Sequence, residues 1–211
     1  MSLIAKQSGG SSLAPIEAGT HPAVCVGIID IGSQYNEKYK KSQPKVIIQF
    51  EVTDETITVD GKEVNRTMSS TYTNTLNERG ALYRDLIAWR GKPFTDEELA
   101  GFNLSKILGV PCLLTVTHQE RNGSTYANVS AISKAMKGME IKPTLPLVTF
   151  DIDDDPLEKV ADFPEWIQKK IQASEQYKER TAGSGNDSGE EYDGPPAFTD
   201  EDDPGEGQLP F

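Results

Sequence analysis

The chain of 211 residues has few of the residues that carry most enzyme chemistry. It contains two cysteines, Cys25 and Cys112, and two histidines, His21 and His118. None of them shows the close pair spacing of a zinc site, and both cysteines lie in apolar, strand-like runs that favour buried thiols. A Ser/His/Asp arrangement, a phosphate-binding glycine loop and a Walker motif are also absent. We therefore expect a protein that is not an enzyme and uses no cofactor.

Long apolar runs and metal-binding loops are missing as well. No stretch approaches the 18 apolar residues of a membrane span, and the first residues lack the apolar region of a signal peptide. The spaced acids Asp151, Asp153 and Asp155 lack the glycine and the glutamate that complete a calcium loop. The sequence thus predicts a cytoplasmic protein without a metal site and without membrane contact.

Basic residues are missing from the end of the chain. Residues 1–150 hold 16 Lys/Arg and 15 Asp/Glu, a balance of +1, whereas residues 151–211 hold 5 and 18, a balance of −13. The last 31 residues contain nine acids and no base, and Gly, Ser and Pro dominate them. This composition predicts a disordered acidic tail over residues 181–211. The Ser/Gly-rich start predicts a flexible arm over residues 1–19.

Between these ends the hydrophobic pattern indicates strands. In the second expected strand Val46, Ile48, Phe50 and Val52 alternate with polar residues, and Ile47 is an exception on the polar face. Asp60-Gly61 predicts a hairpin turn, and Gly32 to Pro44 reads as a polar loop. The first three expected strands are His21–Ile31, Lys45–Thr53 and Glu63–Thr73.

A helical insert follows the third strand. Asn77 is the expected N-cap of a helix over Glu78–Arg90, which Gly91 ends, and Thr95 to Glu98 forms a capping box for a short second helix. Trp89 and Phe94 are expected in the core. Two more strands, Pro111–Gln119 and Ser124–Ile132, flank a turn at 121–123, with Val129 and Ala131 facing inward and Tyr126, Asn128 and Ser130 facing outward.

Three strands, a helix and two strands are the layout of the oligonucleotide-binding fold, a partly open five-stranded barrel. We therefore expect an all-β domain of this type over residues 20–141. Residues 142–180 are expected to form an extended linker and a helix over Glu165–Arg180, which docks on the barrel or on a second subunit.

Four segments resemble a family of phage and prophage single-stranded-DNA-binding proteins. They are Thr20 to Gly32 (THPAVCVGIIDIG), Trp89 to Leu99 (WRGKPFTDEEL), Asn122 to Val129 (NGSTYANV) and the Trp166–Ile171 helix with Ser174-Glu175 after it. The resemblance covers roughly Gly19 to Arg180, and it implies the barrel fold, single-stranded-DNA binding and a place in DNA replication or recombination in a host bacterial cytoplasm. The tail is similar to that of bacterial single-stranded-DNA-binding proteins, in which an acidic stretch and a Pro-Phe tip dock partner proteins.

Binding a single strand without sequence choice requires cations along the backbone path and aromatic faces on which bases stack. The expected nucleic-acid-binding residues are Lys38, Lys40, Lys41, Lys45, Arg66, Tyr72, Arg121, Tyr126 and Asn128. The lysines could instead be merely solvated, and Tyr72 could pack into the barrel. The expected partner-binding residues of the tail are Asp200, Glu201, Asp202, Asp203, Leu209, Pro210 and Phe211.

The sequence favours a passive binder that protects single-stranded DNA and recruits replication or recombination proteins through its tail. Two alternatives stay open: a protein-interaction module of the same fold, and an acidic DNA mimic that inhibits a DNA-binding enzyme. A mimic needs its acids on a rigid surface, whereas the acids here concentrate in segments with the composition of flexible chain. The tail is also expected to compete with DNA for the cationic groove. Assembly into a homo-oligomer is a further open possibility.

Overall fold

The computed structural model describes residues 14–37 and 40–182 of the chain. The strands are β1 (Gly19–Asn36), β2 (Lys41–Val59), β3 (Lys62–Thr73), β4 (Pro111–Arg121), β5 (Ser124–Lys134) and β6 (Val148–Phe150). The helices are α1 (Ala81–Arg90), α2 (Asp96–Ala100), α3 (Glu165–Ala173) and α4 (Glu175–Ala182). Two short 3₁₀ helices, η1 (Leu104–Ile107) and η2 (Leu157–Asp162), complete the described elements.

The strands form one strand-rich sheet, as the alternation pattern predicted. Its order is β3-β2-β1-β4-β5 with antiparallel pairing, and β6 adds to β1 in parallel. β4 pairs with β1 at residues 19–24, and β6 pairs with the same edge of β1 farther along, at 27–29. Within the described residues β3 and β5 approach one another without a pairing ladder, so the sheet curls toward a barrel but does not close.

The two predicted hairpin turns are confirmed by their backbone. Asp60 and Gly61 have φ of 50° and 76°, and Asn122 and Gly123 have φ of 50° and 77°. Two consecutive positive φ angles define the I′ turn, whose twist suits paired strands and which Asn-Gly and Asp-Gly adopt at low cost. These turns set the register of β2 with β3 and of β4 with β5.

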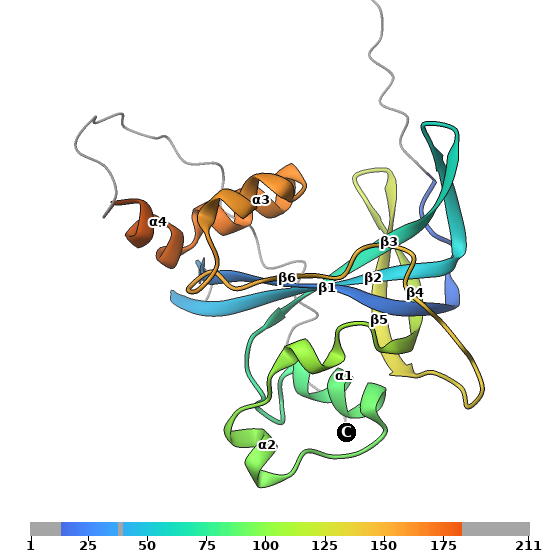
Figure 1. Cartoon of the computed structure of the whole chain (residues 1–211), viewed down its shortest axis with the longest axis horizontal. Helices are drawn as coiled ribbons and strands as arrows, with labels where there is room; N and C mark the ends of the chain where they lie inside the picture. The colour runs from blue at the N-terminus through green and yellow to red at the C-terminus, as the bar shows by residue number, and fades with distance from the viewer. Residues whose placement is uncertain (1–13, 38–39, 183–211) are drawn as a thin grey trace, which may run out of the picture.

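The main core lies on the inner face of the curled sheet and is closed at one end by α1. Phe50 and Trp89 pack with ring centroids 5.6 Å apart, and the Trp89 indole N–H donates to the Pro111 carbonyl at 2.8 Å. Leu82 and Leu86 share the buried face of α1 with Trp89. The expected core positions of Trp89 and Phe94 are confirmed, because both side chains are buried. Figure 1 shows α1 and α2 below the sheet and α3 and α4 above it.

The helical insert begins later than expected. The N-cap of α1 is Gly80 rather than Asn77, whose side chain instead accepts the Arg79 amide in a local turn. Gly91 ends α1 in the left-handed conformation at φ 67°, and the Thr95–Glu98 capping box opens α2, both as expected.

A second apolar cluster covers the opposite face of the sheet, where the sequence predicted a polar surface. Ile29, Ile31 and Ile47 are buried there against Phe150, Ile152, Val160, Ile167 and Ile171. All of the covering residues come from residues 143–182, hereafter the C-terminal segment. Ile47 is therefore not an exposed exception, and the expected linker and helix dock on the barrel of their own chain.

A buried carboxylate holds the start of the C-terminal segment to β2. Glu51 is 0% exposed and accepts hydrogen bonds from the Thr144 amide at 2.9 Å, the Leu145 amide at 3.0 Å and the Asn65 side chain at 2.6 Å. The Thr144 hydroxyl also donates to it. Burial alone would raise the pKa of the Glu51 carboxyl, but these hydrogen bonds outweigh it and hold the pKa below its ordinary value.

The expected C-terminal helix is two helices that break at Ser174. The Ser174 hydroxyl is buried, donates to the Ile171 carbonyl and accepts the Tyr177 amide, so it ends α3 and caps α4. Ser174 also packs against Gly32 of β1, where a Cβ atom would lie 2.7 Å from the Ser174 Cβ. Gly32 has φ of 69°, which suits glycine, and this close approach seats α4 on β1.

The region read as a polar loop, Gly32 to Pro44, is mostly strand. β1 continues to Asn36 and β2 starts at Lys41, with Tyr35 paired to Ser42 across the hairpin. α4 and the end of α3 support this extension, since the Gln34 side chain donates to the Lys170 carbonyl and the Ser33 amide donates to Gln176. Polar composition therefore misled the prediction, because the partners of these polar groups come from far along the chain.

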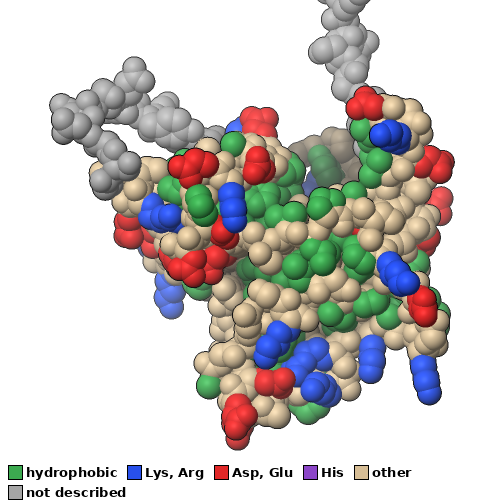
Figure 2. Space-filling view, in the orientation of Figure 1, with side chains coloured by type: hydrophobic (Ala, Val, Ile, Leu, Met, Phe, Trp, Pro, Cys, Tyr) green, Lys and Arg blue, Asp and Glu red, His purple; other side chains and the backbone are tan. Residues whose placement is uncertain are grey.

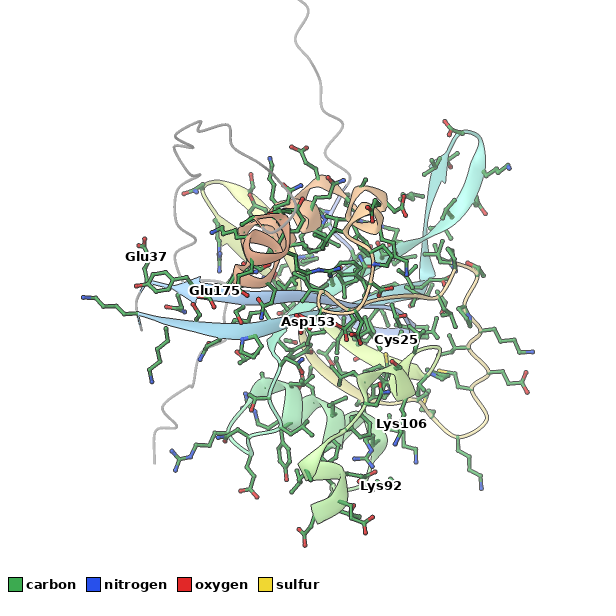
Figure 3. All side chains as sticks on the ribbon, turned by 60° about the vertical axis from the view of Figure 1, so that its left-hand side comes forward. Cys25, Glu37, Lys92, Lys106, Asp153 and Glu175 are labelled. Carbon is green, nitrogen blue, oxygen red and sulfur yellow. The ribbon has the colours of Figure 1, made fainter. Side chains whose placement is uncertain are left out.

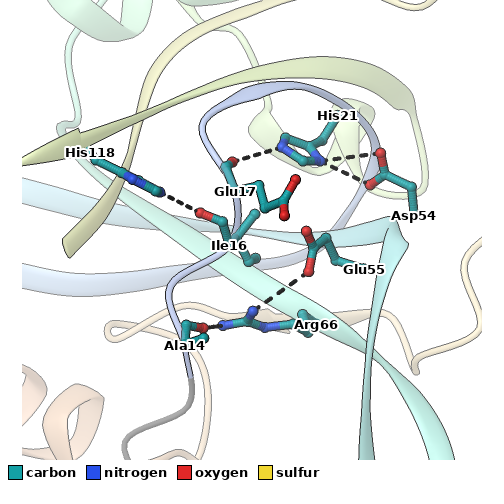
Figure 4. Close-up of polar contacts among 8 residues, drawn as sticks. All are labelled: Ala14, Ile16, Glu17, His21, Asp54, Glu55, Arg66 and His118. Atoms are coloured by element: carbon teal, nitrogen blue, oxygen red, sulfur yellow. Dashed lines mark hydrogen bonds and ion pairs between the residues drawn. The ribbon is translucent and has the colours of Figure 1, made fainter. Parts of the chain in front are cut away.

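The last residues of the expected flexible arm are fixed across one end of the barrel (Figure 4). Ile16 is 3% exposed and belongs to the main core. Arg66 donates to the Ala14 carbonyl at 2.7 Å, His118 to the Ile16 carbonyl at 2.7 Å and His21 to the Glu17 carbonyl at 2.9 Å. The prediction of a flexible arm up to residue 19 is therefore wrong for residues 14–18, and both histidines of the chain serve to hold them.

Candidate nucleic-acid interface

The outer face of the β4–β5 hairpin carries three of the expected binding residues together. Gln119 pairs with Tyr126 and Thr117 pairs with Asn128, so these side chains share one face with Arg121. Tyr126 is 52% exposed, and its outward direction is as predicted. We call Gln119, Arg121, Tyr126 and Asn128 the β4–β5 face.

A shared acceptor orders the polar groups of this face. The Gln119 side-chain oxygen accepts a hydrogen bond from Arg121 Nη2 at 3.1 Å and another from Asn128 Nδ2 at 3.2 Å. Both donors therefore lie beside the exposed ring of Tyr126, which is cross-strand from Gln119. A flat aromatic surface with a guanidinium and amides at its edge suits a stacked base and its neighbouring phosphate.

Negative charge is nearly absent from this hairpin. Glu120 is the acid of β4 and β5, and it pairs with Thr125 on the other face. The β4–β5 face therefore presents no carboxylate that would repel a phosphate backbone. The inward placement of Ala131 was wrong, because a bulge at Ser130 shifts the register there and leaves Ala131 exposed and Ile132 buried.

The expected lysines lie elsewhere. Lys40 and Lys41 are exposed at the tip of the β1–β2 hairpin, beyond residue 36 of β1, whereas β4 pairs with β1 near Gly19. The lysines and the β4–β5 face therefore stand at opposite ends of β1 and do not form one cluster. Lys45 is half-buried and donates to Thr73 at 3.0 Å. Lys38 lies outside the described residues.

Two expected contacts on β3 are used by the fold itself. Tyr72 is 6% exposed, and its hydroxyl donates to Asp85 of α1 at 2.8 Å. Burial and the facing Asp85 charge raise the pKa of the Tyr72 hydroxyl well above its ordinary value. The prediction that Tyr72 offers its ring to bases is therefore wrong, and the alternative that it packs into the barrel is correct. Arg66 pairs with Glu55 at 3.6 Å and holds the N-terminal arm, so it is not a free cation.

The outer face of β1 and β2 is closed to a polyanion. The C-terminal segment covers it and brings the acidic run 151–155 next to Asp30. Burial raises the pKa of the Asp30 carboxyl, and the charges of Asp151 and Asp153 raise it further. Figure 3 places Asp153 and Glu175 beside the β1–β2 hairpin and away from the helical insert between β3 and β4, hereafter the lobe, which carries Lys92 and Lys106.

The described residues offer no metal site. Among residues 14–37 and 40–182 no group of three or more His, Cys, Asp or Glu side chains is placed to hold an ion. Cys25 and Cys112 are free and buried, and burial raises the pKa of the Cys25 thiol to about 12, so it stays protonated and unreactive at neutral pH. No helix in these ranges is long and apolar enough to cross a membrane.

Two exposed residues of the interface, Tyr35 and Gln119, were not expected from the sequence. Tyr35 is 63% exposed on the β1–β2 hairpin, which it shares with Lys40 and Lys41. Its position within the apparent loop concealed that it stands on a strand. Gln119 could have been found, because a two-residue turn at Asn122-Gly123 places positions 119 and 126 opposite one another.

The tail residues of the expected partner site, Asp200 to Asp203 and Leu209 to Phe211, lie outside the described residues. No protein-family model matches the chain, and no curated protein matches it either.

Proposed function

We propose that the chain binds single-stranded DNA without sequence choice and without chemistry on it, in the cytoplasm of the cell that makes it. One observation carries the proposal. An acid-free face on a partly open β-barrel presents an exposed tyrosine with an arginine and an asparagine ordered beside it. Stacking on such a ring contributes about 1–3 kcal/mol per base and is tolerant of base identity.

The tip of the β1–β2 hairpin is proposed as a second contact with DNA. Tyr35 is exposed there beside Lys40 and Lys41, so this tip also combines an aromatic face with cations. Because it stands at the opposite end of β1, we propose that it contacts DNA beyond the part that the β4–β5 face holds. The acids at 200–203 and the apolar end at 209–211 are proposed to recruit replication or recombination proteins, in line with the resemblance stated above.

The first test is fluorescence anisotropy of labelled oligo(dT) with the full chain at several salt concentrations. Tyr126→Ala should weaken binding by about 1–3 kcal/mol without changing the salt slope, because it removes a stack and no charge. Trp166→Ala is the matched control: it removes another exposed aromatic ring, from α3 on the covered side of the sheet, and should leave affinity unchanged. Equal effects of both variants would contradict the proposed face.

The second test separates charge from stacking. Lys40→Ala with Lys41→Ala should lower the salt slope by about 1.4, since each phosphate contact to a single strand contributes about 0.7. Lys159→Ala with Lys169→Ala removes the same charge from the C-terminal segment and should leave the slope unchanged. Absence of any binding to single strands by the unaltered chain would refute the proposed function itself.

The third test concerns the tail. A chain that ends at Ala182 keeps every described element and loses nine acids. If the tail competes with DNA, this shorter chain should bind oligo(dT) more tightly at low salt, and the difference should vanish at high salt. Unchanged affinity at low salt would remove the competition and leave partner recruitment as the proposed role of the tail.

A further inference from the structure

The face of β5 does not end at Tyr126. From Ser124 to Lys134 the residues that point away from the core are exposed, including Asn128, Ser130 and Ser133. Tyr126 is the third residue of β5 and Lys134 is the last, which separates them by about 27 Å at roughly 3.4 Å per residue. β5 is therefore a polar, acid-free strip that leads from the β4–β5 face toward α1.

Lys134 is the last residue of β5, and after the bulge at Ser130 it lies on the same side of the strand as the buried Ile132, opposite to Tyr126. On that side it meets the C-terminal end of α1. A Cβ atom on Gly91 would lie 3.1 Å from Lys134 Cδ and 3.7 Å from its ammonium nitrogen. The stem of Lys134 thus crosses the glycine that ends α1, where the exposed carbonyls of a helix favour a cation. Because Lys92 follows Gly91 directly in the chain, Lys92 and Lys134 are neighbours although their elements are distant in sequence.

Lys106 adds a third cation from the same lobe. It lies 5.7 Å over the ring of Phe102, and Lys92, Lys106 and Lys134 are all exposed. A rigid frame supports them, because the Arg90 guanidinium lies 4.2 Å over Phe94 and 5.1 Å over Phe102 and pairs with Glu98. We call Lys92, Lys106 and Lys134 the lobe cations.

The same lobe also carries three acids on α2. Glu98 is bound to Arg90, whose hydrogen bond lowers the pKa of the Glu98 carboxyl to about 2, and the nearby charge of Lys92 lowers it as well. Asp96 and Glu97 are exposed on α2. No ion pair of the lobe cations with an acid occurs within the part of the chain that the structure describes. Figure 2 shows Lys and Arg side chains gathered over the lower part of the molecule, where Figure 1 places α1 and α2.

From this arrangement we infer that single-stranded DNA bound at the β4–β5 face runs along β5, passes the end of that strand and places its backbone on the lobe cations at the C-terminal end of α1. The opposite course, across the outer face of β1 and β2, is closed by the C-terminal segment and its acids. The inference rests on the proposed function and adds the direction of the strand and its second group of phosphate contacts. At about 3.4 Å per nucleotide, roughly eight stacked nucleotides cover the distance from Tyr126 to Lys134.

The length of the oligonucleotide gives the test. (dT)4 has three steps between its nucleotides, so it spans about 10 Å at this spacing and about 20 Å even when it is stretched to twice this spacing. It cannot join Tyr126 to Lys134, whereas (dT)12 can. In a titration of the full chain, the variant Lys92→Ala/Lys106→Ala/Lys134→Ala should bind (dT)4 as the unaltered chain does. Its affinity for (dT)12 should fall, and its salt slope on (dT)12 should be smaller by up to about 2.

A charge-matched variant and a structural readout complete the experiment. Lys159→Ala/Lys169→Ala/Lys178→Ala removes three lysines from the C-terminal segment and should leave the (dT)12 slope unchanged. Amide NMR shifts on adding (dT)12 should include Lys134 and Lys92, and those on adding (dT)4 should not. If the lobe variant and the unaltered chain show equal salt slopes on (dT)12, the proposed path is wrong while the proposed function stands. The same conclusion follows if the charge-matched variant loses as much of the slope as the lobe variant does. Failure of the unaltered chain to bind either oligonucleotide would overturn both.

Discussion

Removal of the Glu51 carboxylate should loosen the start of the C-terminal segment, at Thr144 and Leu145, from the barrel. Glu51 is fully buried, and four donors converge on it from Thr144, Leu145 and Asn65. A hydrogen bond to a charged group contributes about 1.5–3 kcal/mol, and a donor left without a partner in a buried place costs about 1–3 kcal/mol. The Thr144 and Asn65 side chains can turn to water, whereas the two backbone amides cannot follow without moving the segment. We therefore expect Glu51→Ala to lower the free energy of unfolding by about 3–5 kcal/mol.

Urea unfolding at pH 7 measures this loss of stability, and amide exchange at the same pH shows which residues it affects. In Glu51→Ala, the amide exchange rates of Thr144 and Leu145 should increase more than those of any residue of α1. Glu55→Ala is the control on the same strand, because it removes a carboxylate whose pair with Arg66 is long, at 3.6 Å, and only partly buried, so its loss should cost less, about 1 kcal/mol. A loss below about 1 kcal/mol for Glu51→Ala, with unchanged exchange at Leu145, would refute the role given to this carboxylate.

The Glu51 carboxyl should also make the free energy of unfolding depend on pH, in a direction that follows from its pKa. The hydrogen bonds hold the folded-state pKa of the Glu51 carboxyl below its ordinary value of 4.5. Its stabilising contribution is therefore complete above the unfolded pKa and is lost as the pH falls through the lower folded pKa. The stability difference between the unaltered chain and Glu51→Gln should be constant above about pH 5.5 and shrink in more acidic solution. A difference that does not vary between pH 3 and pH 7 would contradict this.

Three further predictions follow from the packing. Ile16→Ala should cost about 2–4 kcal/mol in urea unfolding, since the side chain is buried in the main core; a loss under about 1 kcal/mol would mean that the arm adds no packing. Tyr72→Phe should cost about 1–2 kcal/mol by removing the hydrogen bond to Asp85, and an unchanged thermal midpoint would contradict it. Gly32→Ala should lower the thermal midpoint more than Gly61→Ala does, because both glycines have positive φ but only the first faces a close side chain, that of Ser174.

The parts of the fold that local chemistry controls could be predicted from the sequence. The I′ turns at 60–61 and 122–123, the capping box at Thr95 and the stop at Gly91 all depend on residues within one turn of each other. The alternation of Val46, Ile48, Phe50 and Val52 indicated the inner face correctly, since all four side chains are buried. Tyr126 was placed outward by the same period-2 argument.

The parts that failed depend on contacts between distant segments. Alternation shows which residues share a face, but it does not show that a segment 100 residues farther along covers the other face, as happens at Ile47. Tyr72 satisfies its hydroxyl with Asp85 of α1, so an aromatic residue on an apparently polar strand turned inward. Ile16 lies in a short segment without alternation, Leu13 to Ala18, and gives no periodic signal, yet its side chain is buried in the main core.

The candidate site was predicted in part for the same reason. Arg121, Tyr126 and Asn128 belong to one hairpin, and the turn between their strands brings them together. The lysines at 40 and 41 were expected beside them because they cluster around the first loop, where barrels of this fold grip DNA, but the register of β1 separates the two groups. The neighbourhood of Lys92 and Lys134 depends on how α1 packs on β5, which no local pattern encodes.

The pairing of β6 with β1 should decide whether fragments of this chain stay in solution. Where β4 leaves β1 to curl around the core, residues 27–29 of β1 would present unpaired backbone groups, and β6 takes them up. An open edge of this kind in so apolar a strand is a template for pairing between molecules. A fragment cut before residue 148 to isolate the barrel should therefore associate or precipitate as its concentration rises. We expect a fragment that extends through the C-terminal helices to stay in solution, because it keeps β6 on β1 and the cover of the second apolar cluster.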